Sequence, residues 1–407
     1  MDKIIRIGVM GARRGSTFMV LSRCMPDKAK LVSVCETESE PIQDRLNDGH
    51  MDESVKVYSD YDEFLDSGID AVVLCNYFHE HAEYAIRALK KGIHVLSDTT
   101  PASTLGYCVK LCEAVEESGA KYMLGTNAAY KRLSQFMKRE IKAGKIGTPI
   151  YGDAEYFHWS PIVAPYADDN RHWRRLMPGT FYNMHTLGTL MYITETVPTK
   201  VCATTVGGKD SAARNRLIDH DGAKVLCEMD NGAKFDVTGC TYMGPTSKWF
   251  RLVGDKGVLE SKRYDESRVL FVDSTTEFLP DSDTPVVGKP IEEYAPKYSE
   301  LGIVSDEEFA TITEEQMNVG HNGMDYFLFN DFLKYIKGEH EPFFNVYRSA
   351  ALSAAAILGW RSVVNGSIEY DIPDFTDKEA RKAVANDFSS PFVDEDSEYF
   401  IRRTKKA

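Results

Sequence analysis

The stretch IIRIGVMGARRGS, residues 4–16, decides the fold of this chain. Its apolar residues predict a short buried strand of a parallel sheet, and a helical pattern begins at Thr17. Between them, Gly8, Gly11 and Gly15 predict a tight turn that lets the backbone approach a ligand closely. The amide end of the following helix would then face a pyrophosphate. The stretch therefore predicts the phosphate-binding turn of a dinucleotide fold.

The glycine spacing in this turn departs from the usual G-x-G-x-x-G pattern. Counted from Gly11, the second and third glycines would fall on Arg13 and Ser16, and Gly15 comes one residue early. Either the loop is one residue shorter than usual, or two of its glycines are replaced. The motif alone also leaves open a glycine-rich turn in an α/β domain that binds no nucleotide.

A carboxylate closes the second predicted strand, LVSVCE at residues 31–36. Glu36 stands about 20 residues after the glycine turn, where such folds place the acidic residue that binds the adenosine ribose. Glu36 would repel a 2′-phosphate, so we predict NAD rather than NADP as the cofactor. Arg13 and Arg14 are the counter-evidence, because a nearby guanidinium can bind that phosphate.

Strand and helix patterns alternate through the rest of the first 127 residues, which predicts a doubly wound (Rossmann) parallel sheet. Ligands of such sheets bind beyond the carboxyl ends of the strands. The candidate cofactor-binding residues are therefore Gly8, Gly11, Arg13, Arg14, Gly15, Ser16, Glu36, Asn76, Tyr77, His79, His81, Asp98, Thr99 and Asn127.

The pattern changes in the second part of the chain. Several strand-like segments alternate polar and apolar residues, and Asp230-Asn231-Gly232 is a strong hairpin signal. Segments 171–194, 326–336 and 350–365 look helical. Residues 273–315 are expected to form an excursion loop. We predict an NAD-binding domain at 1–127 and an α+β domain with a large antiparallel sheet at 128–407, whose charged tail, 377–407, packs back or is peripheral.

Charge and composition exclude several classes of function. The formal net charge of −14 argues against a nucleic-acid partner, which would need a basic face. The eight cysteines are scattered, and His79 and His81 lack a third ligand at credible spacing, so no metal is expected. No apolar run approaches the ~18 residues of a membrane span, and the chain enters a strand without a leader. We therefore expect a cytoplasmic protein with no membrane partner.

Four segments resemble the Gfo/Idh/MocA family of nicotinamide-dependent sugar oxidoreductases: VLCNYFHEH (73–81), GIHVLSDTTPA (92–102), GDAEYFH (152–158) and VGDKGVLE (253–260). In most members the second segment reads G-K-H-V-L-C-E-K-P, and its lysine helps to polarise the reacting hydroxyl. Here Asp98-Thr99-Thr100 stand in phase with Glu-Lys-Pro. Thr99 cannot act as a cation, which argues against a plain lysine-assisted alcohol dehydrogenation.

Three further segments resemble the NAD-dependent glycosidases of this family, such as the bacterial α-N-acetylgalactosaminidases, which also lack the lysine. They are FYNMHTLGTLMYI (181–193), GHNGMDY (320–326) and NVYRSAALSA (345–354). The first resembles Y-x-x-H-x-L-G-P, although Thr189 replaces the proline. This resemblance implies that Tyr182 and His185 are the catalytic pair. The candidate substrate-binding residues are Tyr130, His158, Arg171, Trp173, His321 and Asp325.

The resemblance implies glycoside hydrolysis by transient oxidation of the sugar, elimination, water addition and reduction, with no net redox change. On a helix, Tyr182 and His185 would share one face, and histidine can take or give a proton near neutral pH. Alternatives stay open both for the function and for single residues. The protein could be a sugar or polyol dehydrogenase with His185 as base, or a catalytically silent nucleotide-binding sensor or scaffold. His185 could also be a packed core residue, and His158 a sheet-face aromatic.

The expected partners are a small-molecule sugar or glycoside and further copies of the chain. An open antiparallel sheet has one face to cover, and the polar excursion at 273–315 would not cover it alone. Members of the resembled family commonly pair these sheets. We therefore expect a homo-oligomer, a dimer or a tetramer.

Overall fold

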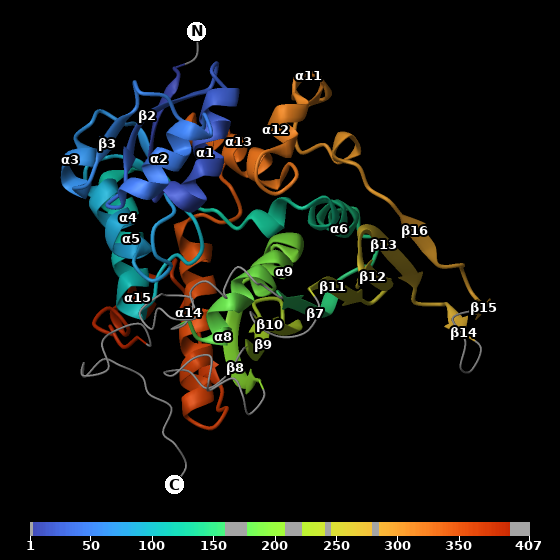
Figure 1. Ribbon diagram of the computed structural model, residues 1–407. Helices are drawn as coiled ribbons and strands as arrows, with labels where there is room; N and C mark the ends of the chain where they lie inside the picture. The colour runs from blue at the N-terminus through green and yellow to red at the C-terminus, as the bar shows by residue number, and fades with distance from the viewer. Residues whose placement is uncertain (1–2, 159–176, 208–221, 241–245, 279–284, 391–407) are drawn as a thin grey trace. The chain divides into compact units, whose positions relative to one another are not determined.

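A computed structural model of the protein describes residues 3–158, 177–207, 222–240, 246–278 and 285–390 (Figure 1). Contacts group the chain into two compact units. The first consists of Met1–Tyr130, Ala310–Ser353 and Phe375–Phe388, and the second of Lys131–Phe309, Ala354–Asp374 and Ser389–Ala407. Units defined by contacts need not coincide with domains, so the expected boundary between residues 127 and 128 stays a prediction.

The first unit is built on a six-stranded sheet in the order β3-β2-β1-β4-β5-β6, with every pair parallel. This confirms the predicted doubly wound sheet. Its inner strands are nearly continuous apolar runs because helices cover both of their faces. The strands are β1 (Ile5–Met10), β2 (Ala29–Cys35), β3 (Lys56–Tyr58), β4 (Ala71–Leu74), β5 (His94–Ser97) and β6 (Tyr122–Leu124).

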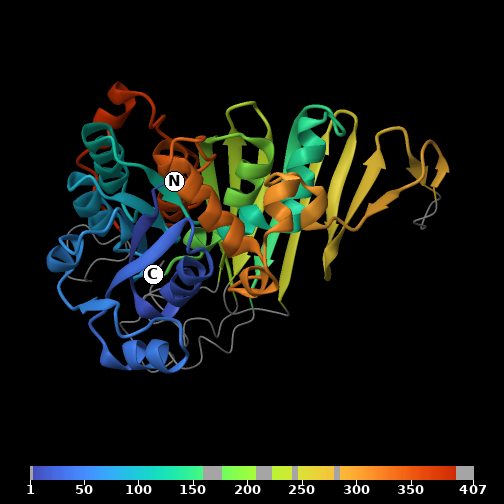
Figure 2. The ribbon, with the colours of Figure 1, turned by 90° about the horizontal axis from the view of Figure 1, so that it is seen from above.

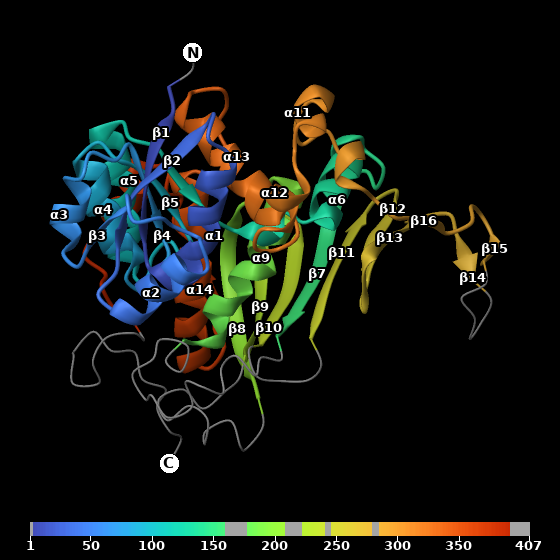
Figure 3. The same ribbon diagram turned by 45° about the horizontal axis from the view of Figure 1, so that its top comes forward.

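Helices α4 and α5 pack together on one side of this sheet, and α1 packs against α13 on the other (Figures 1 and 3). The rings of Phe18 and Phe329 meet edge to face at 5.8 Å, which joins α1 to α13. The helical segments of this unit are α1 (Ala12–Cys24), α2 (Ser39–Asn47), α3 (Tyr61–Leu65), α4 (His81–Lys90), α5 (Leu105–Ser118), η1 (Asn127–Tyr130), α12 (Glu314–Asn318), α13 (Met324–Ile336) and α15 (Lys378–Lys382).

The second unit contains a nine-stranded sheet in the order β16-β13-β12-β11-β7-β10-β9-β8-β17. All of its pairs are antiparallel except β7 with β10, so the predicted large antiparallel sheet is confirmed. Gly232 has φ 84° and closes the expected β9–β10 hairpin. The strands are β7 (Pro149–Phe157), β8 (Pro198–Val206), β9 (Gly222–Met229), β10 (Lys234–Cys240), β11 (Ser247–Gly254), β12 (Gly257–Lys262), β13 (Asp265–Asp273), β16 (Glu292–Tyr294) and β17 (Tyr370–Asp371).

Helices α6 (Arg132–Lys142) and α9 (Leu187–Thr194) pack together against one face of this sheet (Figure 3). Ala154 and Phe250 are register partners on that face and both are buried. The long helix α14 (Val346–Val364) begins in the first unit and ends in the second. Among the described residues, no helix combines the length and the apolar character that crossing a bilayer requires.

Two expectations about local structure are wrong. The segment 273–315 is more than a loop: it contains a two-stranded sheet of β14 (Glu277–Phe278) and β15 (Pro285–Val287), and the edge strand β16, which pairs with β13. It also contains η4 (Tyr298–Glu300) and α11 (Asp306–Ala310) (Figure 2). The helix expected at 171–194 is instead broken, from residue 179 onward, into α8 (Gly179–Tyr182), η3 (Asn183–His185) and α9.

Candidate functional site

The turn between β1 and α1 requires glycine at Gly11. This residue precedes α1 and has φ 89°, a left-handed conformation that side chains disfavour. A Cβ atom here would lie 2.5 Å from the carbonyl oxygen of Cys75, at the end of β4. The missing side chain therefore lets the turn lie directly against the neighbouring strand, as a phosphate-binding turn requires.

Gly15 brings α1 close to the sheet. A Cβ atom on Gly15 would lie 2.4 Å from Cγ1 of Val9, so only glycine allows this approach of helix to strand. Close helix–strand packing is the task of the last glycine in dinucleotide-binding turns. The structure thus favours a loop one residue shorter than usual. Gly8 has a different role, because its Cβ would lie 2.5 Å from the ring of Phe64, and it serves packing inside the unit.

Replacing Gly15 by Ala tests this packing role. We expect the variant to lose about 1–3 kcal/mol of unfolding free energy, because the added methyl group overpacks the helix–strand contact. Val9→Ala removes the atom that clashes, so the double variant should be more stable than the sum of the two single changes predicts, by about 0.5–3 kcal/mol. Urea unfolding of the four proteins measures this coupling, and simple additivity would contradict the assignment.

Glu36 holds the glycine turn and the β2–α2 turn together. Its Oε2 accepts a hydrogen bond from the amide of Ala12 at 2.9 Å. Its Oε1 accepts from the amides of Thr37 and Glu38 at 2.9 and 3.1 Å. The carboxylate is therefore fixed at the end of β2, where the ribose of a dinucleotide would lie.

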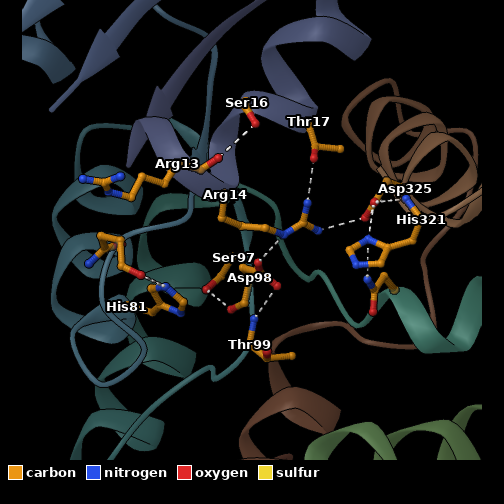
Figure 4. Close-up of polar contacts among 12 residues, drawn as sticks. Arg13, Arg14, Ser16, Thr17, His81, Ser97, Asp98, Thr99, His321 and Asp325 are labelled. Atoms are coloured by element: carbon orange, nitrogen blue, oxygen red, sulfur yellow. Dashed lines mark hydrogen bonds and ion pairs between the residues drawn. The ribbon is translucent and has the colours of Figure 1, made fainter. Parts of the chain in front are cut away.

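The neighbouring Arg13 is already paired with carboxylates. Its Nη2 lies 3.1 Å from both Glu38 Oε2 and Glu40 Oε2, and its carbonyl accepts a hydrogen bond from the Ser16 hydroxyl at 2.9 Å (Figure 4). An arginine bound by two carboxylates is a poor receptor for a 2′-phosphate. This arrangement supports NAD over NADP.

Replacing Glu36 by Ala should weaken NAD binding about 10–100-fold, since a hydrogen bond to a charged group contributes roughly 1.5–3 kcal/mol. A Glu38→Gln/Glu40→Gln variant should instead leave NAD affinity unchanged and strengthen NADP binding, because it releases Arg13. Isothermal titration with both cofactors measures the two effects. Tighter binding of NADP than of NAD by the wild-type protein would refute the assignment.

Three buried polar atoms follow the neighbouring strands β4, β5 and β6. They are Asn76 Oδ1, Thr100 Oγ1 and Thr126 Oγ1, and none has a hydrogen-bond partner within the part of the chain that the structure describes. Buried polar groups are rarely left unsatisfied. Donors and acceptors at this edge of the sheet fit the carboxamide and ring edge of a nicotinamide. Thr100 was missed in the sequence analysis, although its place after a strand could have indicated it.

The two predicted cofactor histidines after β4 differ in environment. His81 is buried, with Nδ1 3.0 Å from the carbonyl of Thr100 and Nε2 3.2 Å from that of Asn76. A neutral ring has one N–H and donates to only one of these carbonyls at a time, so His81 lies between the loops that follow β4 and β5, and its contact with the cofactor stays a prediction. Burial lowers the pKa of His79 to about 4, which keeps that ring neutral. Tyr77 is exposed and its ring lies 6.5 Å from that of His79.

Arg14 joins three segments of the first unit (Figure 4). Its Nε donates to Asp98 at 3.0 Å, and Nη2 donates to Asp325 at 2.8 Å. Asp98 also accepts from the amide of Thr99 at 2.9 Å. A guanidinium group is therefore held beside the loop in which the resembled family carries its lysine. The partnership between residues 14 and 325 could not be predicted from sequence spacing.

His321 and Asp325 lie together, and Asn127 Nδ2 lies 3.2 Å from Nδ1 of His321. Tyr130 is buried and donates its hydroxyl hydrogen bond to Asp331, so it supports the fold of this unit. Among the described residues, no group of three His, Cys, Asp or Glu side chains is arranged as metal ligands. The absence of a metal stays a prediction.

An aromatic cluster occupies the second unit. The hydroxyl of Tyr182 lies 2.9 Å from Nδ1 of His158. Tyr156 stacks on His185 with ring centroids 5.0 Å apart, and the rings of Tyr182 and His185 meet edge to face at 5.1 Å. Nζ of Lys248 lies 5.2 Å from the centroid of the Tyr156 ring. The cluster thus combines one phenol–imidazole pair with a second imidazole.

Tyr182 and His185 lie close together, but they are not on the continuous helix that the sequence predicts. Tyr182 ends α8, and His185 ends the 3₁₀ segment η3. Side chains three residues apart eclipse each other in a 3₁₀ turn, which keeps the two rings together without a continuous helix. His158, expected on a substrate platform, is the hydrogen-bond partner of Tyr182. Arg171 and Trp173 lie outside the described residues.

Comparison with known families agrees with this architecture. Residues 5–126 match the model described as "Oxidoreductase family, NAD-binding Rossmann fold", and residues 134–260 match the "GFO/IDH/MocA C-terminal domain". These two models of one family cover more than half of the chain. Residues 238–382 match the "Glycosyl hydrolase 109, C-terminal domain".

Individual relatives agree with these matches. The alpha-N-acetylgalactosaminidase of Tannerella forsythia is 22% identical over 85% of this chain and 81% of its own length. The glycosyl hydrolase family 109 protein 1 of Shewanella sp. (strain MR-4) is 23% identical over 92% and 85%. Levoglucosan dehydrogenase, solved in complex with NADH and L-sorbose, has the same fold, with a TM-score of 0.72 and 16% identity over 92% of this chain and 100% of that one.

The Rossmann sheet with its glycine turn, followed by the large mostly antiparallel sheet, therefore defines an NAD-binding enzyme of the oxidoreductase type. The chain belongs to the Gfo/Idh/MocA family and carries the C-terminal domain of glycosyl hydrolase family 109.

Proposed function

We propose that this protein is an NAD-dependent glycosidase, which cleaves a glycoside through transient oxidation of the sugar and has no net redox change. The observation that carries the proposal is the 2.9 Å contact between the Tyr182 hydroxyl and Nδ1 of His158. The family 109 domain supports it, as does the name of the Tannerella forsythia relative. A simple dehydrogenase would not need this phenol–imidazole pair in addition to a base.

A bound NAD would supply a reversible hydride acceptor for the sugar ring. The residues of this chain that would hold it are Gly11 and Glu36 at the adenosine side, and Asn76, Thr100 and Thr126 at the nicotinamide side. Their glycine-lined turn, fixed carboxylate and unsatisfied polar atoms suit the two ends of a dinucleotide.

Tyr182 and His158 would perform the proton transfers of elimination and water addition. A ketone in the sugar ring acidifies the neighbouring C–H bond, and the substituent on the anomeric carbon can then leave. When Nδ1 of His158 accepts the phenolic proton, Tyr182 can take a proton from that carbon. When Nδ1 carries a proton, the Tyr182 hydroxyl can give its own to the departing oxygen. His185 is stacked on Tyr156 and lies beside this pair.

The proposal is tested with a panel of glycosides that includes α-N-acetylgalactosaminides. Free sugar should appear without accumulation of NADH. Sugar analysis and NADH absorbance, measured in the same samples, follow the two products. Net NADH formation would show a dehydrogenase instead. The absence of both products across the panel would favour a catalytically silent protein.

We also propose a homo-oligomer located in the cytoplasm. Helices α6 and α9 cover one face of the large sheet. On β11, Trp249 and Arg251 alternate with the buried residues and so belong to the opposite face, where they pair with acidic residues of neighbouring strands. That face could pair with a second copy. Light scattering at micromolar concentration tests the oligomer, and a monomer would contradict it.

A further inference from the structure

Lys131, Lys248 and Glu266 form a charged cluster in the second unit, the lysine cluster. Nζ of Lys131 donates to Oε2 of Glu266, and Nζ of Lys248 lies 3.9 Å from Oε1 of the same carboxylate. Among the described residues, no second carboxylate pairs with either ammonium group. Within that part of the chain, the lysine cluster therefore carries one positive charge in excess.

The two lysines are more covered than the carboxylate that they share. The side chains of Lys131 and Lys248 are 12% and 25% exposed, whereas that of Glu266 is 42% exposed. Lysine usually extends its charged end into water. Burial is the main cause that lowers the pKa of Lys131; Glu266 counteracts it, and the charge of Lys248 lowers the pKa further. The fold thus holds two like charges together in a covered place, where a charge is costly unless it is paired.

The N-terminus of α6 adds positive charge at the same place. Lys131 is the N-cap residue of this 11-residue helix, its side chain makes no capping hydrogen bond, and the first turn has no acidic residue. A helix N-terminus carries a partial positive charge and favours small polar or acidic side chains over lysine. Helix α6 also packs against β13, which carries Glu266. The helix end and the lysine cluster therefore both favour an anion.

The lysine cluster lies beside the aromatic cluster because of the register of three strands. Lys248 of β11 and Gly239 of β10 are both register partners of Tyr156 on β7. Nζ of Lys248 lies 5.2 Å from the centroid of the Tyr156 ring. A Cβ atom on Gly239 would lie 3.1 Å from the carbonyl carbon of Tyr182. Tyr156 thus stands between the strand of Lys248 and the strand under Tyr182, which are two strand spacings, or about 10 Å, apart.

Resting on the proposed function, we propose that the glycoside is anionic: a carboxylate or sulfate group on it binds between Lys131 and Lys248 while its scissile bond lies at Tyr182. The anion supplies the negative charge that Glu266 alone does not. Lysine ammonium groups act as compact point charges and so accept either kind of oxyanion. The two strand spacings place this group away from the oxidised carbon, and no bond to it is made or broken.

An ion-pair network with only a structural role predicts different behaviour. Removing any of its members would change stability and leave the preference among substrates as it was. In an anion site, Glu266 competes with the anion for the two ammonium groups. Removal of the carboxylate and removal of a lysine should therefore change anion affinity in opposite directions.

Binding of inorganic sulfate tests the site without turnover. In isothermal titration, Glu266→Gln should bind sulfate more tightly than the wild type, and Lys248→Gln about 10–100-fold more weakly. NMR of isotope-labelled lysine side chains, assigned with Lys131→Gln, should show that sulfate raises the pKa of Lys131, because a bound anion favours the charged ammonium. Equal sulfate affinity in the three proteins, or a Lys131 pKa that sulfate leaves unchanged, would overturn the proposal.

Matched glycosides test the preference itself. Hexosides are compared with hexuronides and with hexoside 6-sulfates, with the charged sugar placed either as the cleaved sugar or as the leaving sugar. The wild-type kcat/KM should be higher for an anionic member than for its neutral counterpart. Lys248→Gln should lower that ratio about 10–100-fold. The arm with the higher ratio tells carboxylate from sulfate.

Lys145→Gln is the matched control for this comparison. Nζ of Lys145 lies 2.9 Å from Glu292 and 4.7 Å from the ring centroid of Tyr294, so it combines the same kinds of partner elsewhere in the second unit. This variant should keep the wild-type ratio of anionic to neutral kcat/KM. An equal fall of the ratio in Lys145→Gln and Lys248→Gln would overturn the assignment to the lysine cluster.

Failure of this proposal can be told apart from failure of the proposed function. If the wild type cleaves neutral glycosides at least as well as every anionic counterpart, the proposal falls and the proposed function stands. A wild type that releases no sugar and forms no NADH from any glycoside would refute the proposed function. The sulfate titrations would then still decide whether the lysine cluster binds an anion.

Discussion

Tyr182→Phe should lower turnover by about 10²–10⁴-fold, the usual contribution of a positioned proton-transfer group. The change removes only the hydroxyl that lies 2.9 Å from His158 Nδ1 and keeps the ring that packs against Tyr156 and His185. NAD affinity and melting temperature should therefore stay near those of the wild type. Turnover of a cleaved glycoside, measured beside a thermal melt, checks both parts.

Tyr192→Phe is the matched control for this prediction. Tyr192 lies on α9 of the same unit, and its hydroxyl accepts a hydrogen bond from Gln135 at 2.9 Å. This variant should keep wild-type turnover. Residual activity of Tyr182→Phe near the wild-type level would remove Tyr182 from the proposed chemistry.

The two histidines near Tyr182 can be separated in the same assay. If His158 is the proton partner, His158→Asn should reduce turnover about as much as Tyr182→Phe, and the double variant should lose little more, because the pair acts as a unit. His185→Asn should then have the smaller effect. A larger loss of turnover in His185→Asn than in His158→Asn would instead support His185 as the catalytic partner of Tyr182, as the sequence resemblance implies.

The largest expected effect on stability follows replacement of Asp325. Asp325→Ala should lower the free energy of unfolding by about 3–5 kcal/mol, since breaking a buried ion pair leaves the partner charge uncompensated. Arg14 would lose its 2.8 Å partner, and the amide and ring of His321 would lose their acceptor. Chemical denaturation of both proteins measures the difference.

Glu315→Ala is the control for that measurement. Glu315 pairs with Arg23 at 2.9 Å, but both side chains are more than half exposed. Exposed pairs of this kind contribute about 0–1 kcal/mol. A similar loss in the two variants would contradict the importance of burial at Asp325.

Asp325 also predicts a pH dependence of stability. Its folded pKa of about 2 lies below the reference value of 3.8. The stabilisation is therefore fully present above pH 3.8 and is lost as the pH falls through about 2. Asp325→Asn does not titrate, so the stability difference between wild type and this variant should shrink over that range. Denaturation series at successive pH values test it, and a constant difference would argue against the shift.

Most of the first sheet could be predicted from sequence because its signals are local. A buried parallel strand is a short apolar run, and β2 (Ala29–Cys35) overlaps the strand expected at residues 31–36. The Asp230–Gly232 hairpin is likewise specified by neighbouring residues. The breaks in the helix around Tyr182 were not predictable, because an apolar segment does not reveal where a 3₁₀ turn replaces an α-helical one.

The candidate site was only partly predictable for the same reason. Single positions after strands, such as Glu36 and Asp98, follow from the topology rule of parallel sheets. Partnerships between distant residues do not. The Arg14–Asp325 ion pair joins residues 311 positions apart, and the Tyr182–His158 contact joins a helix end to a strand end. Such pairs are set by tertiary packing, which has no local pattern.

The three-segment composition of the first unit has a consequence for how the protein is made. Its sheet is complete once Tyr130 has been synthesised, yet Phe329 of α13 is made only roughly 200 residues later, and the segment that ends at Phe388 roughly 260 residues later. At about 5–20 residues per second, the ribosome needs about 10–40 s to reach Phe329. During this time the surface of α1 that receives Phe329 has no partner. The nascent chain thus exposes an apolar surface beside its cofactor turn, and a chaperone that binds apolar segments, or early binding of NAD, would protect it until the last segments are made.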